Sequence, residues 1–344
     1  MKTIVINNPA AKEGGALTVL ESFLKTIHKQ KCKNIFYIFV SVIDLKKYEK
    51  NNIKIIVLER QNFRQRLLWD NIGLKKYLKL NKIKPDLFLS LQNTGVNLPK
   101  KIPQILYFHQ ALSISDIKWD ILKKEERTYY FYQNIYPFFI RQYLNRITKI
   151  IVQTNWIKEK FSKKFNYSLS DIIVEKPVLE IFNIEAIEII PKTKFRIFYP
   201  ATPFIYKNHK LIIESLKKLK EENLELESKL ECIFTFSRGE NAEIDKLIKK
   251  YSLENIIQLV GKISYEKVLE YYKNSDLLIF PSYIETLGLP LIEAKKFNLN
   301  ILAVDLPYSR EAIGSYKNVK YFKSFDLIRI YDYLTENIHK LKQV

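Results

Sequence analysis

The sequence predicts an α/β fold in which two Rossmann-like, doubly wound domains face a cleft. Apolar, strand-like runs alternate with helical patterns along the chain, and such alternation is typical of parallel sheets covered by helices. A stretch at 185–194 that carries charges and a proline interrupts the alternation near the middle. The chain of 344 residues is also longer than one ordinary core accommodates. We therefore expect two domains joined by a linker.

The first domain is expected over residues 1–184, followed by an interdomain linker at 185–194. Its apolar runs predict buried strands at 3–7, 34–42, 87–91, 104–109 and 149–153. Amphipathic patterns between these runs predict helices at 15–29, 63–80, 122–145 and 156–164.

The alternation restarts in a second domain, expected over 195–324. Its strands are predicted at 195–199, 230–236, 256–260, 276–280 and, as the last strand, 300–304. Helices are predicted at 209–222, 242–251 and 265–273, and a further one begins near Pro290. The final segment, 325–344, is expected to form a helix that packs back on the first domain.

Composition excludes several classes of protein. Hydrophobic residues make up 47% of the chain and aromatic residues 13%, which excludes a disordered chain. Lysine and arginine outnumber aspartate and glutamate by 57 to 37, giving a net charge of +20. This excess favours polyanionic surroundings such as nucleic acid, anionic lipid or phosphorylated substrates. AT-rich coding produces the same mixture of Lys, Ile, Asn and Tyr, so both origins of the charge stay open.

The cysteines and the N-terminus indicate a cytoplasmic protein. Cys32 and Cys232 lie far apart and form no C-x-x-C pattern, so neither a disulfide framework nor a zinc site is expected. The chain opens on a strand-like run that is too short for the apolar part of a signal peptide. No window approaches the ~18–20 apolar residues that a membrane-spanning helix requires.

Two glutamates at the end of a predicted strand form the strongest candidate site. Glu285 and Glu293 flank the turn Gly288-Leu289-Pro290, after the apolar run 276–280. The order is strand, glycine-bearing loop and helix start, which is where doubly wound sheets bind ligands. The loop N–H groups suit a phosphate, and they belong to Thr286, Leu287, Gly288 and Leu289. The alternative is two ordinary glutamates favoured by the helix dipole.

Basic residues follow two other strands of the second domain. Lys207 lies at the start of the helix after 195–199, and Arg238 follows the strand at 230–236. A cation and backbone N–H groups at a helix start favour a diphosphate. By itself, a lysine in a lysine-rich chain would not indicate a binding site. The loops near Lys207, Arg238 and Glu285 are, however, expected at the same sheet edge, which favours a shared site.

In the first domain, polar residues and glycines follow the predicted strands. Gly14 and Gly15 open a helix after the first strand, where a backbone can approach an anion closely, although a tight turn explains them as well. Asn93 follows the run 87–91, and His109 ends the run 104–109. A histidine in a cleft exchanges protons or bonds a sugar hydroxyl, whereas a buried one is satisfied by a backbone carbonyl.

The segment 274–294, NSDLLIFPSYIETLGLPLIEA, closely resembles the donor-site segment of the retaining glycosyltransferases of family 4. The segment 305–311 resembles the family segment that follows, and the polar strand ends near Asn93 and His109 resemble sequences in bacterial surface-polysaccharide members. The resemblance spans most of the chain and implies the two-domain GT-B architecture. It implies transfer of a sugar, with retention, from a nucleotide-diphosphate sugar to a hydroxyl of a glycan or a lipid-linked oligosaccharide.

The resemblance also implies roles for individual residues. Glu285 would contact the donor sugar, and His109 would bond it near the reacting centre. Glu293 would bind the ribose and Lys207 the diphosphate. Gly14-Gly15 would approach the diphosphate or the acceptor.

One departure from the family pattern concerns the phosphate. The arginine that usually precedes the lysine is replaced here by Ala201 and Thr202, and Arg238 is the candidate substitute. Neither a cofactor nor a metal is expected, because the chain has no Asp-x-Asp motif and the family holds the leaving diphosphate with backbone and basic groups.

Aromatic and basic residues are concentrated at 126–146. This mixture suits peripheral contact with an anionic membrane at the inner face of the plasma membrane. The alternative is a large helix of the first domain that packs its aromatics into the core.

Two other classes of protein stay open. A nucleic-acid-binding protein would share the charge but would show a binding motif or a basic tail. A nucleotide-sugar epimerase would share the fold and differ in its product.

Overall fold

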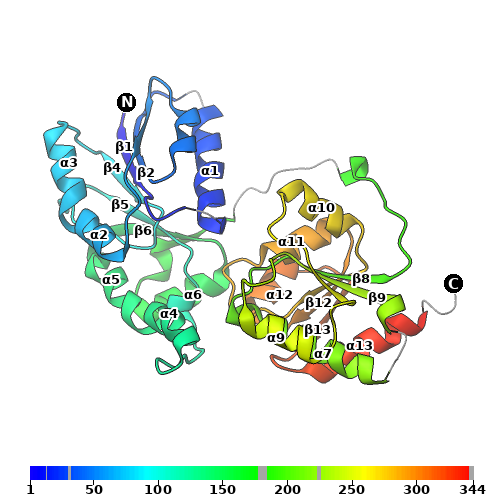
Figure 1. The fold of residues 1–344 in the computed structure, drawn as a ribbon. Coiled ribbons are helices and arrows are strands. Elements are labelled where there is room, and N and C mark those ends of the chain that lie inside the picture. Colours follow the sequence, from blue (N-terminus) through cyan, green and yellow to red (C-terminus); the bar gives the residue numbers. More distant parts are fainter. Residues whose placement is uncertain (13, 30–31, 177–183, 223–225, 341–344) are drawn as a thin grey trace. The chain divides into compact units, whose positions relative to one another are not determined.

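The protein is described by a computed structural model that covers residues 1–12, 14–29, 32–176, 184–222 and 226–340. The chain divides into two compact units, Met1–Leu179 and Glu180–Val344, each with its own parallel sheet (Figure 1). The predicted α/β class with two parallel-sheet domains is confirmed. No helix among the described residues is long and apolar enough to cross a membrane.

The first unit contains seven parallel strands in its described residues. In chain order they are β1 (Thr3–Asn7), β2 (Ile35–Val40), β3 (Ile53–Val57), β4 (Leu87–Ser90), β5 (Gln104–Phe108), β6 (Ile147–Val152) and β7 (Ile172–Val174). Their spatial order is β3-β2-β1-β4-β5-β6-β7, so the order reverses between β1 and β4. The sequence missed β3 and β7, which are edge strands of five and three residues with one exposed position each.

The helices of the first unit are α1 (Gly14–Lys29), α2 (Phe63–Leu68), α3 (Leu74–Leu80), α4 (Arg127–Tyr130), α5 (Tyr136–Gln142) and α6 (Asn155–Phe165). The predicted helices at 63–80 and 122–145 are therefore interrupted. A π-helical turn, Trp69–Gly73, separates α2 from α3, and a second one, Phe131–Ile135, separates α4 from α5. Pro137 in the first turn of α5 lacks the N–H group that a continuous helix requires.

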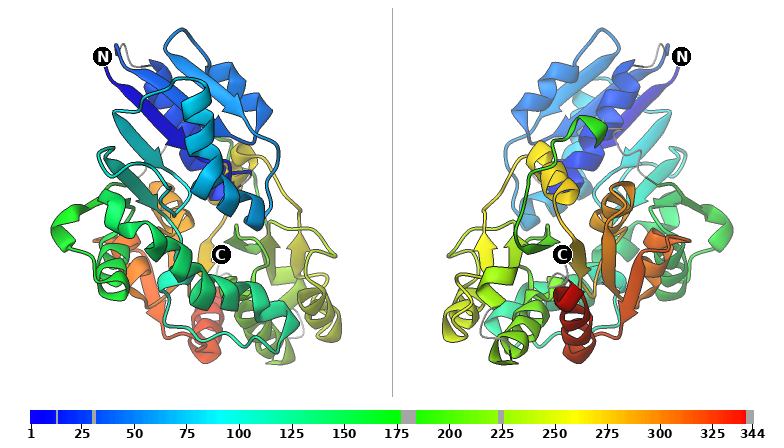
Figure 2. Two further views of the ribbon diagram at one scale, coloured as in Figure 1. Left: turned by 90° about the vertical axis from the view of Figure 1, so that its left-hand side faces the viewer. Right: turned by 90° about the vertical axis from the view of Figure 1, so that its right-hand side faces the viewer.

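Successive residues of β1 face opposite layers of the first unit. Ile6 packs among Leu20 and Leu24 of α1, whereas Val5 packs with Leu74 of α3. The helix α1 thus covers one face of the sheet and α2–α3 the other (Figure 1). The cyan α3 lies in front of the strands in the left view of Figure 2. This alternation buries both faces, as expected of a parallel sheet.

The described part of the second unit contains six parallel strands. They are β8 (Phe195–Tyr199), β9 (Leu230–Phe234), β10 (Ile257–Leu259), β11 (Leu277–Phe280), β12 (Asn300–Val304) and β13 (Val319–Phe322). Their spatial order, β10-β9-β8-β11-β12-β13, is the dinucleotide-binding order 3-2-1-4-5-6. The sequence missed β13, which follows the strand predicted to be the last and has two half-buried positions and one exposed position.

The helices of the second unit are α7 (His209–Glu222), α8 (Leu226–Lys229), α9 (Ala242–Lys250), α10 (Tyr265–Lys273), α11 (Leu289–Lys296), α12 (Pro307–Ile313) and α13 (Leu327–Lys340). Right-handed crossovers place α7 and α9 on one face of the sheet and α10, α11 and α12 on the other.

The last helix packs within the second unit. Here α13 lies along α7, where the Ser215 hydroxyl donates a hydrogen bond to the Leu327 carbonyl at 3.3 Å and Lys218 lies 4.5 Å from the centre of the Tyr331 ring. This packing is not the one expected from the sequence, which placed the helix against the first domain. The amphipathic pattern of α13 predicts that one face is covered but does not specify the covering surface.

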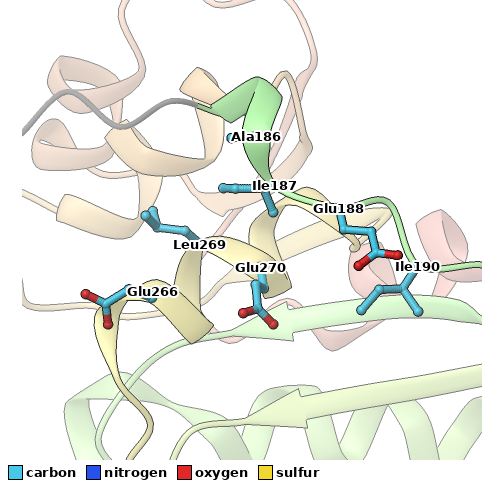
Figure 3. A pocket seen from close by; sticks show the side chains of 7 residues that line it. All are labelled: Ala186, Ile187, Glu188, Ile190, Glu266, Leu269 and Glu270. Atoms are coloured by element: carbon cyan, nitrogen blue, oxygen red, sulfur yellow. The ribbon is translucent and has the colours of Figure 1, made fainter.

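The linker residues are held by the second unit. The Asn274 side chain accepts a hydrogen bond from the Ile190 N–H group at 2.6 Å and donates to the Glu188 carbonyl at 3.0 Å, and Lys192 pairs with Asp276 at 2.6 Å. Where the linker runs along α10, a cavity of about 450 Å³ is lined by Ala186, Ile187, Glu188, Ile190, Glu266, Leu269 and Glu270 (Figure 3). The boundary between the units falls at 179/180, five residues before the predicted boundary. Residues 177–183 of the predicted first domain and residues 341–344 of the predicted last helix lie outside the described ranges.

Candidate functional site

The strand order of the second sheet reverses between β8 and β11, which is where open α/β sheets bind ligands. The loop 200–208 follows β8 and carries Lys207, and the loop 281–288 follows β11 and carries Glu285. Parallel strands present these two loops at the same edge. The fold therefore brings together two residues that are 78 positions apart in the sequence.

Lys207 and Glu285 form an ion pair at this switch point. The Lys207 Nζ atom lies 2.5 Å from Glu285 Oε1, and the two side chains are only 16% and 13% exposed. The ammonium group also lies 5.6 Å from the centre of the Tyr206 ring. A charge-assisted hydrogen bond that is shielded from water is stronger than an exposed one. The pair thus offers a cation and a carboxylate at adjacent points of one site.

Hydrogen bonds between the two loops hold this pair in place. The Tyr206 carbonyl accepts from the Tyr283 N–H group at 2.9 Å and from the Ser282 hydroxyl at 3.3 Å. The buried Tyr199 hydroxyl donates to the Lys207 carbonyl at 2.7 Å, and Tyr308 donates to the Ser282 carbonyl. Both loops are therefore attached to the core, which fixes the backbone under Lys207 and Glu285.

The turn before α11 requires glycine. Gly288 has a φ of +71°, and a Cβ atom there would lie 3.2 Å from the Leu291 Cδ1 atom and 3.4 Å from the Tyr308 ring. The helix then starts at Leu289 with Pro290 in its first turn, while Leu287 is buried and Thr286 half-buried. In the first turn Pro290 has no N–H group and the Leu291 N–H group donates to the Gly288 carbonyl at 3.0 Å, so the helix start offers the Leu289 N–H group to an anion.

Glu293 lies on α11 with both carboxylate oxygens hydrogen-bonded. The Tyr265 hydroxyl donates to Oε1 at 2.8 Å and the Tyr272 hydroxyl donates to Oε2 at 3.0 Å. Burial raises the pKa of this carboxyl group, and the two tyrosines oppose that shift. The sequence did not identify the tyrosines. Their spacing of seven residues on α10 puts them on one helix face, which is the signal that was available.

The candidate phosphate arginine lies on a neighbouring loop. Arg238 is exposed in the loop after β9. That loop is tied to the loop after β8, because the Asn241 amide donates to the Pro203 carbonyl at 2.8 Å. The structure thus places three loops on one sheet edge, as the sequence predicted, and the ion pair joins the first and the third.

His209 was not recognised in the sequence. It begins α7, two residues after Lys207, and is almost completely buried. The rings of Tyr199, Phe234 and Phe236 surround it at centroid distances of 4.7–5.0 Å. Burial lowers its pKa to about 3, so the ring is neutral at physiological pH. This histidine anchors the start of α7 by packing and does not supply charge.

In the first unit, the structure brings His109 and Asn93 together. The His109 N–H group of the backbone donates to Asn93 Oδ1 at 2.7 Å, and the ring Nε2 donates to the Leu91 carbonyl at 3.1 Å. Burial lowers the pKa of the ring. The backbone-carbonyl partner envisaged as the alternative for His109 is therefore present, and Nδ1 is the nitrogen left for a ligand. Gly14 and Gly15 form the first residues of α1.

The described residues contain no group of three or more His, Cys, Asp or Glu side chains arranged to hold a metal ion.

Comparison with known proteins finds a family match within the second unit. Residues 180–339 match the family model of Glycosyl transferases group 1. A glycosyltransferase from Rickettsia africae ESF-5 is 16% identical, with a TM-score of 0.67 over 97% of this chain and 87% of that chain. The Anabaena protein HepE, solved with UDP, is 15% identical, with a TM-score of 0.68 over 99% and 92%. No curated protein matches the chain.

A third structure is that of WaaG, a glycosyltransferase involved in lipopolysaccharide biosynthesis. It is 14% identical, with a TM-score of 0.68 over 98% of this chain and 90% of that chain. At these identities the likeness shows the fold, which is that of the GT-B glycosyltransferase structures. The family match covers the unit that holds Lys207, Glu285 and Glu293, and it supports the glycosyltransferase class.

Proposed function

We propose that the protein is a retaining, metal-independent glycosyltransferase of family 4 that acts in surface polysaccharide biosynthesis. It transfers a hexose from a nucleotide-diphosphate sugar to a hydroxyl of a glycan or of a lipid-linked oligosaccharide. The observation that carries the proposal is the shielded ion pair between Lys207 and Glu285 at the switch point of the unit that matches the glycosyltransferase family.

The donor is assigned to the second unit. Lys207 and the N–H groups of the loop and first turn at 286–289 hold the diphosphate, because a cation and a helix N-terminus both stabilise anions. Glu293 binds ribose hydroxyls through its carboxylate, which Tyr265 and Tyr272 orient. Arg238 adds positive charge from the neighbouring loop. The UDP complex of HepE supports a nucleotide donor of this type.

The reaction follows from these parts. As the bond between the anomeric carbon and the diphosphate oxygen breaks, negative charge develops on the leaving phosphate, where Lys207 and the N–H groups stabilise it. The sugar gains oxocarbenium character, and the acceptor hydroxyl attacks from the face that the diphosphate leaves. The departing phosphate oxygen takes the hydroxyl proton. The configuration of the sugar is therefore retained without a protein nucleophile.

Glu285 orients the donor sugar and stabilises the positive charge that develops on it. Its carboxylate already faces the Lys207 ammonium, so a bound diphosphate shares that cation with Glu285. His109 is proposed to bond the donor sugar through Nδ1, since its Nε2 atom is engaged by the Leu91 carbonyl. Gly14, Gly15 and Asn93 are proposed for the diphosphate or the acceptor.

The acceptor is proposed to reach the enzyme from an anionic membrane at the cytoplasmic face. Phe138 on α5 is 68% exposed and Ile135 is 41% exposed, while Leu68 and Ile72 on the neighbouring helical segment are 61% and 57% exposed. The two segments pack together, because Phe63 contacts Phe131 and Phe139 at ring-centroid distances of 5.0 Å. Exposed basic residues flank these apolar positions, namely Arg64, Lys75, Lys76 and Arg141. Most aromatics of the segment 126–146 pack against the core instead.

A transfer assay tests the proposed class of enzyme. Nucleotide-diphosphate sugars are first screened for the donor that raises the melting temperature most. That donor is then incubated with the protein, and the released sugar or product is identified by NMR. We expect the sugar to leave the nucleotide with its anomeric configuration retained. An epimerised sugar nucleotide would identify an epimerase, and an inverted product would exclude the retaining mechanism.

A further inference from the structure

A buried carboxylate, that of Asp70, lies where the strand order of the first sheet reverses. Asp70 belongs to the π-helical turn Trp69–Gly73, between α2 and α3, and is 7% exposed. It contacts residues at or just after the ends of β1 and β4, the two strands between which the order reverses. Open α/β sheets bind ligands at such a point, and π-turns inside helices occur frequently at functional sites. Because Asp70 is buried, any role at this edge is exerted through its neighbours.

Three side chains donate hydrogen bonds to Asp70. The Gln92 Nε2 atom donates to both carboxylate oxygens, at 2.7 and 2.9 Å, and the Thr94 hydroxyl donates at 3.4 Å. The Asn7 Nδ2 atom donates at 3.1 Å. Three donors around one carboxyl group suit its ionised form, which only accepts hydrogen bonds. Hydrogen bonds to a charged acceptor are also stronger than those between neutral groups, so Asp70 anchors both Gln92 and Thr94.

Asn93, a candidate site residue, lies between these two anchored residues. Its backbone has a φ of +68°, in the left-handed region that few residues other than glycine adopt. Asp70 fixes the residues on both sides of it, and the Asn97 N–H group donates to the Asp70 carbonyl at 2.9 Å. The loop 91–97 is therefore attached to the π-turn through side chains and through the backbone.

The same loop holds His109. The Asn93 Oδ1 atom accepts from the backbone N–H group of His109 at 2.7 Å, and the Leu91 carbonyl accepts from its ring Nε2 atom at 3.1 Å. Leu91 packs with α1 on one face of the sheet, whereas Asp70 belongs to the helical layer on the other face. Both the backbone and the ring of His109 are thus held by residues of the loop that Asp70 fixes.

We propose that Asp70 is a positioning residue for sugar transfer: it fixes the loop 91–94, and through that loop it keeps the Nδ1 atom of His109 in place for the donor sugar. A small displacement of Leu91 or Asn93 would move that nitrogen, and a misplaced group loses much of its effect on the rate. The role of Asp70 rests on the proposed function, which assigns His109 to the donor sugar. Asp70 itself acts only through the loop.

The positioning depends on pH, because Asp70 must be ionised to accept all of these hydrogen bonds. Burial raises the pKa of Asp70 to about 7, while its hydrogen bonds and the nearby Arg66 oppose that shift. The other titratable groups near it are Tyr136 and Tyr143, whose pKa values are raised by burial, so both stay protonated near neutral pH. As the pH falls through about 7, Asp70 gains a proton and is no longer a pure acceptor for the donors around it. The loop should then hold the histidine less firmly.

Amide hydrogen exchange of the ligand-free protein tests the first step, from Asp70 to His109. The His109 amide is followed by NMR in the full-length protein, and its protection factor is compared between the wild type and Asp70→Asn. The variant keeps the size of the side chain but sets an N–H group against the surrounding donors. At about pH 8 we expect protection to be roughly three- to tenfold lower in Asp70→Asn, as the loss of one hydrogen bond implies. The wild type should lose a similar factor between about pH 8 and about pH 6, and the variant should not.

Two controls separate positioning from a general loss of stability. The amides of β2 should keep their protection in Asp70→Asn, because the proposed effect is confined to the loop and His109. Asp86→Asn removes an exposed carboxylate of the same unit that accepts from the Thr3 N–H group at 2.7 Å, and it should leave His109 unchanged. Equal protection of His109 in Asp70→Asn and the wild type would refute the role of Asp70. If the variant does not fold, the wild type decides alone, since protection that is independent of pH would refute the role as well.

Turnover tests the second step, from His109 to sugar transfer. With the nucleotide sugar that gives the largest thermal shift, kcat of Asp70→Asn should fall roughly three- to tenfold at about pH 8 while KM stays unchanged, because the second unit binds the donor. In the background of His109→Ala, Asp70→Asn should have no further effect on kcat, because both substitutions act on the same ring. An unchanged kcat in Asp70→Asn, or effects that multiply, would refute positioning through His109.

Failure of the proposed function and failure of the Asp70 role give different results. A wild type that transfers sugar from none of the nucleotide sugars would refute the proposed function and the catalytic use of His109, whereas exchange of the His109 amide would still show whether Asp70 holds the loop. A wild type that transfers sugar, with a His109 amide that responds neither to pH nor to Asp70→Asn, would refute the Asp70 role alone.

Discussion

At the scale of single residues, the second unit concentrates opposite charges in a shielded place. Lys207 and Glu285 are held by loops that the core fixes through Tyr199, Ser282 and Tyr308. A buried ion pair is weak evidence of stability, because desolvation opposes the attraction between the charges. Its presence at a switch point is therefore better explained by ligand binding than by folding.

Glu293 gives the first test at this scale. Glu293→Gln keeps one acceptor and one donor for Tyr265 and Tyr272, so the fold should survive, but the charged acceptor for the ribose hydroxyls is lost. We expect the KM for the nucleotide sugar to rise roughly tenfold with kcat unchanged, which corresponds to about 1.4 kcal/mol. The control is Glu254→Gln on the exposed surface of the same unit. An unchanged KM would remove Glu293 from the donor site.

The site residues differ in how far the sequence predicts them. Glu285, Glu293 and Lys207 follow apolar runs at strand ends, and that local pattern is visible without a structure. The contacts of Glu293 with Tyr265 and Tyr272 depend on how α10 packs beside α11, which no local pattern reveals.

At the scale of elements, the strands inside each sheet were predicted, whereas three of the four edge strands of the described sheets, β3, β7 and β13, were not; the edge strand β10 was predicted, at 256–260. β1, β8 and β11 are mostly apolar because helices cover both faces of their sheets. β3, β7 and β13 lie at sheet edges, are three to five residues long and include polar or exposed positions. Length alone does not decide whether a strand is recognised, because the missed β3 and the predicted β8 both have five residues; β3 includes an exposed position and β8 does not.

The turn that starts α11 gives an element-scale test. In Gly288→Ala the alanine must adopt the φ of +71° that glycine has here. Its Cβ atom lies 3.2 Å from the Leu291 Cδ1 atom. We expect the unfolding free energy of the second unit to fall by about 1–2 kcal/mol, and donor affinity to fall as well, because the N–H groups at 286–289 move.

Gly314→Ala is the matched control for this turn. Its φ is also positive, at +61°, but a Cβ atom there meets no atom within 4 Å, and the residue ends α12. It should lose stability in urea unfolding and keep its affinity for the donor. If both variants bind the donor as the wild type does, the turn before α11 is structural only.

At the scale of the whole molecule, the excess of basic residues is expected to attract the protein to the anionic membrane that carries the proposed acceptor. Phe138→Glu places a charge at the most exposed aromatic position of α5, so binding to vesicles of phosphatidylglycerol and phosphatidylcholine should weaken. Binding of the wild type should also fall as salt increases, because salt screens exposed charges. Sedimentation with vesicles measures both effects.

Leu169→Glu is the control for the membrane surface, since Leu169 is 49% exposed elsewhere in the first unit. It should bind vesicles as the wild type does. Equal binding of Phe138→Glu and the wild type, or binding that ignores salt, would show that the basic charge reflects composition alone.

The central claim is that Lys207 and Glu285 form the site where the donor sugar reacts. The most direct test is the turnover of Glu285→Gln with the nucleotide sugar that gives the largest thermal shift. We predict that kcat falls by roughly two orders of magnitude, while the dissociation constant of the donor, measured by calorimetry, changes by less than about threefold. Turnover equal to that of the wild type would contradict the assignment of the site.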